Sequence, residues 1–374
     1  MTIKVLLVED SPVALTIIRR IIESAEDMTL VGTARSGVEA LELLSKVKPD
    51  IVCTDLMMPR MNGLELIHKI MTTNPVPILV ISGCIQEDDE NNIFQLLEAG
   101  AVDIFPKPAS GTLQEYDSIR ERLLEKIRVI AGVKVFTKRV RPARIRLVDP
   151  WEKPVKVHKP PATPLQEATQ SSTSPIAVVA LAASTGGPQA FQEVLGSLPA
   201  DFPVPLLCVQ HISTGFLKGF LEWLQGNIPL PVVIAKTGEK PQPGKVYFPP
   251  ERMHLRIDGQ GRFYCGDDTP VDNHNPSATV LFETVAHYYG PSAVGVLMTG
   301  MGRDGARGLL TLKQKGGYTI AQDESSSIVF GMPQEAIKLG AVHKVLPLPH
   351  IAPHLLKLLQ SRGFLSSPDS LSGV

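Results

Sequence analysis

Short apolar runs alternate with amphipathic stretches through the first third of the chain. The runs KVLLV, MTLVGTA, DIVCT, PILVIS and VDIFP are typical of strands that are buried on both faces. Between and after them, helical spacing of apolar positions is found at residues 13–25, 37–47, 64–72, 87–98 and 113–130. This alternation predicts a doubly wound parallel sheet of five strands over residues 1–131.

The same alternation returns at Pro175 and continues to about residue 361. Strands are predicted for the runs IAVVALA, PLLCVQ, PVVIA, KVYF, HLRI, AVGVLM and YTIA. Helices are predicted near residues 188–197, 215–225, 277–289, 304–315, 333–339 and 350–360. A second doubly wound α/β domain with a mostly parallel sheet is therefore expected, followed by a flexible Ser-rich tail at residues 362–374.

Residues 132–174, between these two regions, have a different composition. Nine Lys or Arg residues but only two acidic residues lie between Lys134 and Lys159, and several prolines are interspersed. Such a segment has no apolar pattern from which to build a core, which predicts a flexible linker. Its positive charge fits a solvated tether, or a segment that docks on an acidic surface with Trp151 as an anchor.

Overall composition restricts the class of protein only broadly. The 374 residues are 43% hydrophobic with a net charge of -1, so bulk charge favours neither a nucleic acid nor a membrane as partner. The four cysteines are scattered without a CxxC pair, which predicts free thiols in a reducing compartment and no zinc site. No apolar run approaches the ~18 residues of a membrane span. We expect a cytoplasmic protein without direct membrane insertion.

Charged and hydroxyl side chains follow four strands of the first predicted sheet. Glu9 and Asp10 follow the first strand, Asp55 the third, Ser82 the fourth and Lys107 the fifth. Because the carboxyl ends of parallel strands share one edge of a sheet, these groups should lie together. Clustered carboxylates favour a hard cation such as Mg2+, beside which a carboxylate can attack a phosphoryl group.

The stretches VEDS, DLMMPRMNG, ISG and FPKP closely resemble the response-regulator receiver family over residues 1–131. The resemblance implies a flavodoxin-like fold, phosphorylation of Asp55 and a histidine kinase as the phosphate donor. It also implies the remaining roles: Mg2+ binding by Glu9, Asp10, Asp55 and the Met57 backbone, and phosphorylation switching by Ser82 and Lys107.

In the second domain a serine, a histidine and an aspartate follow predicted strands. Ser184 lies in the turn ASTGG, His211 ends the run PLLCVQH, and Asp304 lies in TGMGRDG. A near-neutral histidine can deprotonate a serine while an aspartate fixes its tautomer, so the three suggest a hydrolytic triad. The glycines would then allow close backbone approach and positive φ angles.

Two other functions compete with hydrolysis. Gly300, Gly302 and Gly305 form G-x-G-x-x-G, and Asp323 follows the next predicted strand, as in dinucleotide-binding domains. That reading leaves Ser184 and His211 without a role. A receiver that drives a DNA-binding or scaffold domain is the other candidate, but no helix-turn-helix pattern is evident.

The stretches AASTGGP, QHI, NPSATVLF and MTGMGRDG are similar to motifs of the CheB family of chemotaxis protein-glutamate methylesterases, over about residues 175–360. The resemblance implies hydrolysis of γ-glutamyl methyl esters on chemoreceptors, with deamidation of receptor glutamines by the same route. It implies no cofactor for that reaction and no nucleic-acid partner. It assigns Ser184 as nucleophile, His211 as base and Asp304 as its orienting acid, with Thr185 and Met301 near the oxyanion.

Ala182, Asn62 and Gly83 differ from the family patterns, as does the stretch SATVLF, and two hypotheses follow from the architecture. Ala182 replaces a usual glycine, and SATVLF lacks an aspartate expected on a substrate-facing helix. The same esterase could serve a methylated receptor array outside chemotaxis. The unphosphorylated receiver is predicted to pack over the Ser184 edge and to block a bulky helical substrate.

Overall fold

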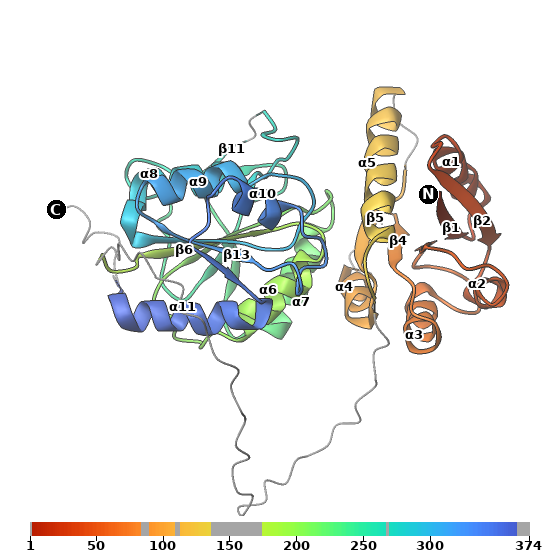
Figure 1. Cartoon of the computed structure of the whole chain (residues 1–374), viewed down its shortest axis with the longest axis horizontal. Coiled ribbons are helices and arrows are strands. Elements are labelled where there is room, and N and C mark those ends of the chain that lie inside the picture. Colours follow the sequence, from red (N-terminus) through yellow and green to blue (C-terminus); the bar gives the residue numbers. More distant parts are fainter. Residues whose placement is uncertain (1, 84–89, 109–112, 136–173, 267–268, 365–374) are drawn as a thin grey trace, which may run out of the picture.

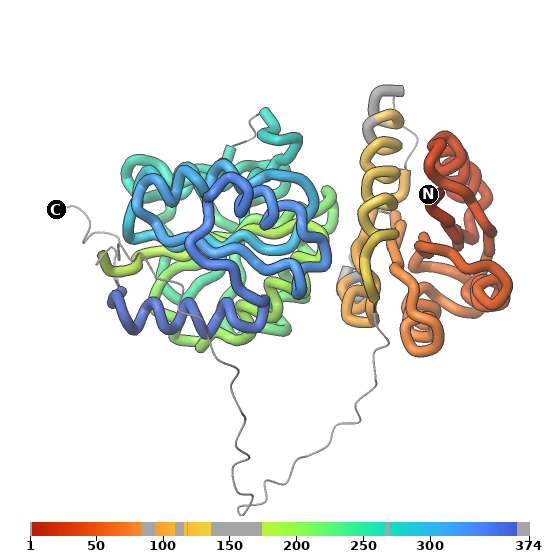
Figure 2. The backbone as a smooth tube through the Cα atoms, in the orientation of Figure 1, coloured from red at the N-terminus to blue at the C-terminus, as the bar shows by residue number. Residues whose placement is uncertain are grey.

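The computed structural model describes residues 2–83, 90–108, 113–135, 174–266 and 269–364. Residues 136–173 of the predicted linker, including Trp151, lie outside this range, as do residues 365–374 of the predicted tail. Two α/β lobes follow each other along the chain (Figure 1, Figure 2). Among the described residues, no helix has the length and apolar character needed to cross a membrane.

The N-terminal lobe is a parallel sheet of order β2-β1-β3-β4-β5. This confirms the predicted doubly wound fold and its flavodoxin-like strand order. The direction in which strands are added to the sheet reverses between β1 and β3. The carboxyl ends of these two strands therefore lie side by side, next to the loops that carry the acidic residues. The elements are β1 (Ile3–Val8), α1 (Pro12–Glu23), β2 (Met28–Ala34), α2 (Gly37–Leu44), β3 (Ile51–Thr54), α3 (Gly63–Thr73), β4 (Ile78–Ser82), α4 (Glu90–Ala99), β5 (Asp103–Pro106) and α5 (Leu113–Ala131).

The local sequence explains where these helices begin. Ser11, Ser36 and Asn62 precede α1, α2 and α3, and each side chain accepts a hydrogen bond from a backbone N–H of the first turn. Pro12 adds a residue that tolerates the first helical position of α1. Each helix thus starts directly after the loop that leaves the carboxyl end of a strand.

The C-terminal lobe contains a seven-stranded sheet of order β14-β13-β12-β6-β7-β9-β8, and all its strand pairs are parallel. The prediction of a mostly parallel sheet is confirmed. Its elements are β6 (Val178–Ala183), α6 (Gly187–Gly196), β7 (Leu206–Gln210), α7 (Leu217–Asn227), β8 (Val232–Ile234), β9 (Val246–Phe248), α8 (Ala278–Tyr289), β12 (Ala293–Leu297), α9 (Ala306–Gln314), β13 (Tyr318–Gln322), α10 (Met332–Lys338), β14 (Lys344–Leu346) and α11 (Leu348–Arg362).

The order of strands has a direct consequence for the site. The chain first places β7, β8 and β9 on one side of β6, with β9 between β7 and the edge strand β8, and then returns to place β12 on the other side of β6. The reversal between β6 and β12 is a topological switch point, where ligands bind in open α/β sheets. The ends of β12, β6 and β7 are therefore neighbours.

Two short strands were not predicted. β11 (Phe263–Gly266) pairs antiparallel with β10 (His254–Ile257) in a separate two-stranded sheet. β14 is an edge strand whose Lys344 and Val345 are exposed, so it lacks the apolar run of a buried strand. Both strands are short and only partly buried, which explains why hydrophobic periodicity does not reveal them.

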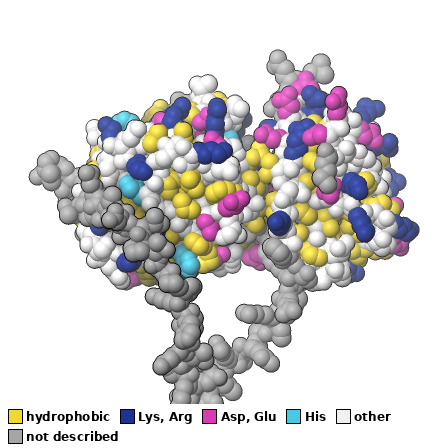
Figure 3. All heavy atoms as spheres, viewed as in Figure 1, with side chains coloured by type: hydrophobic (Ala, Val, Ile, Leu, Met, Phe, Trp, Pro, Cys, Tyr) yellow, Lys and Arg dark blue, Asp and Glu magenta, His cyan; other side chains and the backbone are white. Residues whose placement is uncertain are grey.

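The two lobes contact each other through α4 and α7. Phe94 of α4 packs against Phe220 and Trp223 of α7, with ring centroids 5.7 Å apart in both pairs. The Trp223 indole N–H donates to Glu98 Oε1 over 2.8 Å. In the space-filling view, apolar side chains lie along the junction, whereas acidic and basic side chains gather over the N-terminal lobe (Figure 3).

Candidate active site and phosphorylation site

Three carboxylates meet at the carboxyl edge of the N-terminal sheet. Glu9, Asp10 and Asp55 offer ligand atoms that lie within 4.8 Å of one another. Glu9 and Asp55 are buried, and Glu9 Oε2 is a buried oxygen without a hydrogen-bond partner among the described residues. A cation bound between these oxygens would give that atom a partner, so the residues present fit a hard divalent ion.

Lys107 reaches into this cluster from the loop after β5. Its ammonium group donates to Asp55 Oδ2 over 2.7 Å and to Glu9 Oε1 over 2.9 Å. Burial raises the pKa of both carboxyls, and the hydrogen bonds from Lys107 oppose that rise without cancelling it. Ser82, the last residue of β4, is buried, and its carbonyl accepts from the backbone N–H of Lys107. The structure thus gathers all the N-terminal residues singled out from the sequence.

Ser184 follows β6 directly, at the switch point of the C-terminal sheet. Its backbone N–H donates to Thr299 O over 3.0 Å, and its carbonyl accepts from Gln210 Nε2 over 2.8 Å. Gly186 has φ 76° and caps α6, so the chain turns sharply from strand into helix after Ser184. The turn leaves the Ser184 side chain partly exposed at the N-terminus of α6.

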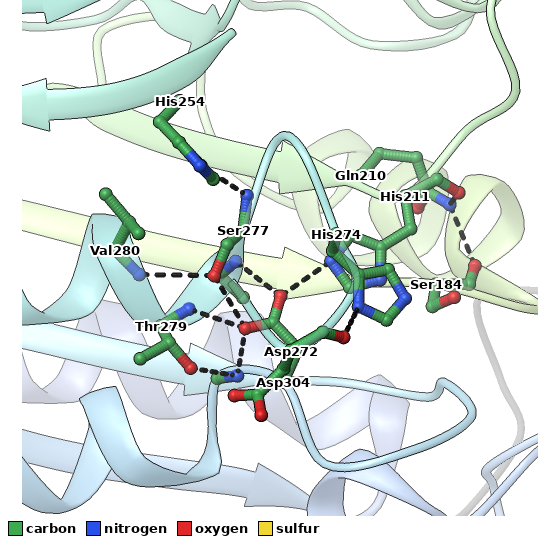
Figure 4. A network of polar contacts seen from close by, with 12 residues as sticks. Ser184, Gln210, His211, His254, Asp272, His274, Ser277, Thr279, Val280 and Asp304 are labelled. Carbon is green, nitrogen blue, oxygen red and sulfur yellow. Dashed lines mark hydrogen bonds and ion pairs between the residues drawn. The ribbon is translucent and has the colours of Figure 1, made fainter. Parts of the chain in front are cut away.

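His211 lies at the end of the neighbouring strand β7. Its backbone N–H donates to Ala183 O over 3.0 Å, which ties the histidine loop to the serine turn. Its ring Nε2 lies 2.8 Å from Asp304 Oδ2, while Nδ1 is buried without a partner among the described residues (Figure 4). No hydrogen bond between the side chains of Ser184 and His211 is formed in the described structure. Catalytic hydrogen bonds of this kind often form only once substrate is bound.

Asp304 is fully buried and accepts hydrogen bonds from several directions. Besides His211, its donors are the Ser277 hydroxyl at 2.7 Å and the backbone N–H groups of Ala278, Thr279 and Gly305 at 2.7, 3.0 and 2.9 Å. Ser277 is the N-cap of α8, so the carboxylate faces the N-terminus of that helix (Figure 4). A helix N-terminus stabilises negative charge, which anchors the carboxylate.

These contacts keep Asp304 ionised. Burial alone would raise the pKa of this carboxyl, but the hydrogen bond and attraction of His211, together with Ser277 and the α8 backbone, hold it far below its usual range. The negative charge can therefore orient the His211 imidazole at every physiological pH. The position of Asp304 and its negative charge both suit a carboxylate that orients the His211 ring.

The structure adds three polar residues to this site that the sequence analysis did not identify. Gln210 donates to the carbonyls of both Ser184 and His211, and Ser277 holds Asp304. His274 stacks on His211 with ring centroids 3.9 Å apart and planes 14° from parallel. A sequence signal existed for Ser277, because a serine before an apolar run is typical of a helix N-cap.

The stretch SATVLF at the start of α8 is buried inside the protein. Thr279, within the stretch that lacks the aspartate expected on a substrate-facing helix, is fully buried. Its hydroxyl accepts from Gly305 N–H over 2.8 Å, inside the protein. This residue therefore supports the Asp304 loop and does not face solvent.

The C-terminal site contains a second group of side chains of metal-binding type. His211, His274 and Asp304 offer ligand atoms within 4.8 Å of one another. However, ring nitrogens bind metals in the plane of the imidazole, and the two stacked rings lie in nearly parallel planes. Their lone pairs do not converge on one ion, so the N-terminal carboxylates are the better metal site.

The glycine-rich loop is occupied with internal contacts. Gly305 has φ 85° and its N–H donates to Thr279 and Asp304, which leaves it no donor for a pyrophosphate. A Cβ at Gly300 would lie 2.8 Å from Ser184 Cβ, so glycine permits close approach to the serine. Asp323 accepts from Ser325 and Ser326 and shapes a surface loop. The geometry favours a hydrolytic site over a dinucleotide site.

Thr185 and Met301 are the residues that were predicted to lie near an oxyanion. Thr185 is the next residue, is buried, and its carbonyl accepts from the Thr299 hydroxyl. Met301 follows Gly300, which packs on Ser184. A pocket next to His211 is lined by Gln210, Ile212, Thr214, Glu251 and Pro276, among others.

We expect the stability of this lobe to fall as the pH drops from 6.5 to about 4. Burial, followed by repulsion from His211, lowers the pKa of His274 to about 4. In the unfolded chain this histidine has its ordinary pKa of about 6.5, so it takes up a proton at a higher pH than in the folded protein. Acidification through that window therefore favours unfolding, by up to about 3 kcal/mol. Thermal unfolding of the wild type and of His274→Phe should be compared between pH 8 and 4. The expectation would be contradicted if the unfolding temperature fell by the same amount with pH in both proteins.

Comparison with known protein families supports the two-part organisation. The chain matches the family model for the response regulator receiver domain over residues 5–115 and the model for CheB methylesterase over residues 179–355. Neither match extends into the segment between the two lobes.

Curated relatives align over nearly the full chain. A "protein-glutamate methylesterase/protein-glutamine glutaminase" of Nitrosospira multiformis is 41% identical over 96% of this chain and 98% of its own length. A protein of the same name, number 4, from Myxococcus xanthus is 42% identical with the same coverage. The solved CheB methylesterase catalytic domain of Thermotoga maritima is 34% identical, covering 49% of this chain and 98% of that one, with a TM-score of 0.48.

Proposed function

Because the chain belongs to the family of protein-glutamate methylesterases/protein-glutamine glutaminases and carries a receiver domain, we propose that it demethylates chemoreceptors under control of phosphorylation. The substrates are γ-glutamyl methyl esters and receptor glutamines. The observation that carries the proposal is the alignment of Ser184, His211 and Asp304 at the ends of three adjacent strands, with His211 bonded to Asp304. Methanol release from a methylated receptor tests it.

In the first half of the reaction, Ser184 Oγ attacks the ester carbonyl. Since His211 Nε2 is taken by Asp304, Nδ1 is the ring nitrogen that accepts the serine proton. The negative charge that develops on the carbonyl oxygen is stabilised near Thr185 and Met301, at the N-terminus of α6. Collapse of the tetrahedral species breaks the C–O bond, and the His211 proton leaves with methanol.

In the second half, water attacks the acyl-serine. His211 Nδ1 accepts a proton from the water, and the glutamate carboxylate departs as the proton returns to Ser184. With a glutamine substrate the same steps release ammonia in place of methanol. No cofactor takes part in either half of this scheme.

For the receiver, we propose that Asp55 accepts a phosphoryl group from a histidine kinase. Mg2+ would be held by Glu9, Asp10 and Asp55, with the backbone of Met57, and would neutralise charge on the phosphoryl oxygens. The unpartnered Glu9 Oε2 supports this assignment. Lys107 already bonds Asp55, so it can contact the phosphoryl group, and Ser82 at the adjacent strand end is the switch hydroxyl.

Phosphorylation would act through the contact between α4 and α7. The α7 helix follows the loop that leaves His211, so a receiver docked on α7 limits the approach of a bulky helical substrate. Movement of the Ser82 region on phosphorylation would weaken the packing of Phe94 on Trp223. The predicted packing of the receiver over the Ser184 edge is thus proposed to use the contact between α4 and α7.

We expect Phe94→Ala to raise the basal rate of the unphosphorylated enzyme about 2- to 10-fold, since buried aromatic anchors dominate interfaces. The catalytic residues are untouched by this change. Methanol release is measured without phosphodonor, alongside a fragment of residues 175–374 and the control Val13→Ala, which removes an exposed receiver side chain. If the fragment is no faster than the full unphosphorylated chain, inhibition by the receiver is wrong.

The remaining assignments follow from this function. We propose a receiver domain at 1–131, a linker at 132–174, a methylesterase domain at 175–361 and a tail at 362–374. The partners are a chemotaxis histidine kinase and the cytoplasmic domains of methyl-accepting chemoreceptors, which makes the cytoplasm the site of action.

A further inference from the structure

A tight turn presents His274 to the active site. Val271 and His274 exchange two backbone hydrogen bonds, of 3.1 and 2.9 Å, around Asp272 and Asn273. Both central residues have positive φ, 49° and 65°, a conformation that Asp and Asn tolerate better than other residues with side chains.

Two further contacts fix the turn and the ring. Arg303, the residue before Asp304, pairs with Asp272 Oδ1 over 3.1 Å, so the turn is joined to the loop that carries the orienting acid. His274 Nδ1 donates to Asp272 O over 2.6 Å, which sets the plane of its imidazole. The ring is thus held by the turn that bears it.

This fixed ring lies flat against His211. The centroids are 3.9 Å apart, closer than the 4.5–7 Å common for aromatic pairs, and the planes differ by 14° (Figure 4). Asp304 holds His211 through Nε2 alone, and a single hydrogen bond leaves the ring able to rock about that contact. The stacked ring of His274 opposes such rocking and so fixes the direction of Nδ1.

The charge state of His274 suits this role. The titratable groups that act on it are His211, Asp304 and Asp272, the last of which is paired with Arg303, and burial holds the pKa of His274 at about 4, so the ring is neutral near pH 7. When His211 takes up the serine proton, the resulting imidazolium therefore meets no like charge across the stack. The site therefore holds a neutral, planar side chain against the ring of His211.

We propose that His274 is a positioning residue of the esterase, a rigid plate that aims Nδ1 of the base His211 at Ser184. The inference rests on the proposed triad and deepens it. His274 acts through its planar face, without exchanging a proton. Planarity is therefore the property to test.

The experiment compares His274→Phe with His274→Leu in the full-length protein. Both changes remove the hydrogen bond to Asp272 and fill a similar volume, but only phenylalanine is planar. We expect His274→Leu to lower kcat about 10- to 100-fold with KM unchanged, because small misplacements of catalytic groups have effects of this size. His274→Phe should keep kcat within about 3-fold of wild type.

Labelling of Ser184 by a fluorophosphonate gives a second readout that needs no receptor, and its rate should follow kcat in both variants. His287→Ala, an exposed histidine of α8, is the matched control and should leave both rates unchanged. Equal losses in the Phe and Leu variants, or no loss in either, would overturn the inference. Activity in Ser184→Ala would instead overturn the triad itself, so the two failures are distinguishable.

Discussion

Ser184→Ala should abolish methanol release, with a fall in kcat of at least about 10⁴-fold, because the serine and histidine of a triad act as one unit. The substitution removes only the attacking oxygen. The backbone bonds of residue 184 to Thr299 and from Gln210 remain, so the temperature of unfolding should not change. Methanol release from a methylated receptor, with and without acetyl phosphate, measures the rate.

Ser361→Ala is the matched control for that variant. Ser361 lies exposed in α11, and its hydroxyl bonds only Leu358 O among the described residues. Its loss should leave the rate unchanged. A Ser184→Ala protein that demethylates receptors at the wild-type rate would refute the acyl-serine mechanism.

Asp304→Asn should lower kcat about 10³- to 10⁴-fold, as in related triads where the acid becomes an amide. Every hydrogen-bond partner of the Asp304 carboxylate in the described structure is a donor. The NH₂ group of the asparagine, which is itself a donor, must therefore face another donor. With its oxygen toward Ser277 and Thr279, its NH₂ faces Ala278 N–H and His211 Nε2. His211 can accept that bond only as the tautomer protonated on Nδ1, which removes the base.

The same change should lower thermal stability, since the buried Ala278 N–H loses its acceptor at a cost of about 1–3 kcal/mol. Asp258→Asn offers a control, because Asp258 also accepts backbone N–H groups, in the turn between β10 and β11. That variant should retain kcat. An Asp304→Asn enzyme with full kcat would show that the orientation of His211 does not depend on this carboxylate.

Much of the fold could be predicted from apolar runs. Most strands that carry functional residues, namely β3, β4, β6, β7 and β12, are buried along their whole length, and their sequences are largely apolar, as in VVALAA of β6. β11 and β14 could not be predicted in this way, because exposed residues interrupt their apolar pattern. Since functional residues of such sheets follow strand ends, Ser184, His211, Asp304 and Asp55 could be proposed before any coordinates.

The rest of the site depends on contacts distant in sequence. Nothing near His211 shows that Nε2, and not Nδ1, bonds Asp304 93 residues away. His274 and Gln210 contribute through a stacked ring and two carbonyl contacts, which composition and spacing do not encode. The buried position of Thr279 likewise follows from the way α8 packs on the Asp304 loop.

The contact between the lobes also provides an optical signal. Trp223 is one of two tryptophans in the chain; its indole is buried at the junction, bonded to Glu98 and packed on Phe94. Indole emission shifts to longer wavelength when the ring becomes hydrated. In a Trp151→Phe background, without any added fluorophore, the proposed release of the receiver by phosphorylation should therefore shift the emission of Trp223 to longer wavelength as phosphodonor is added.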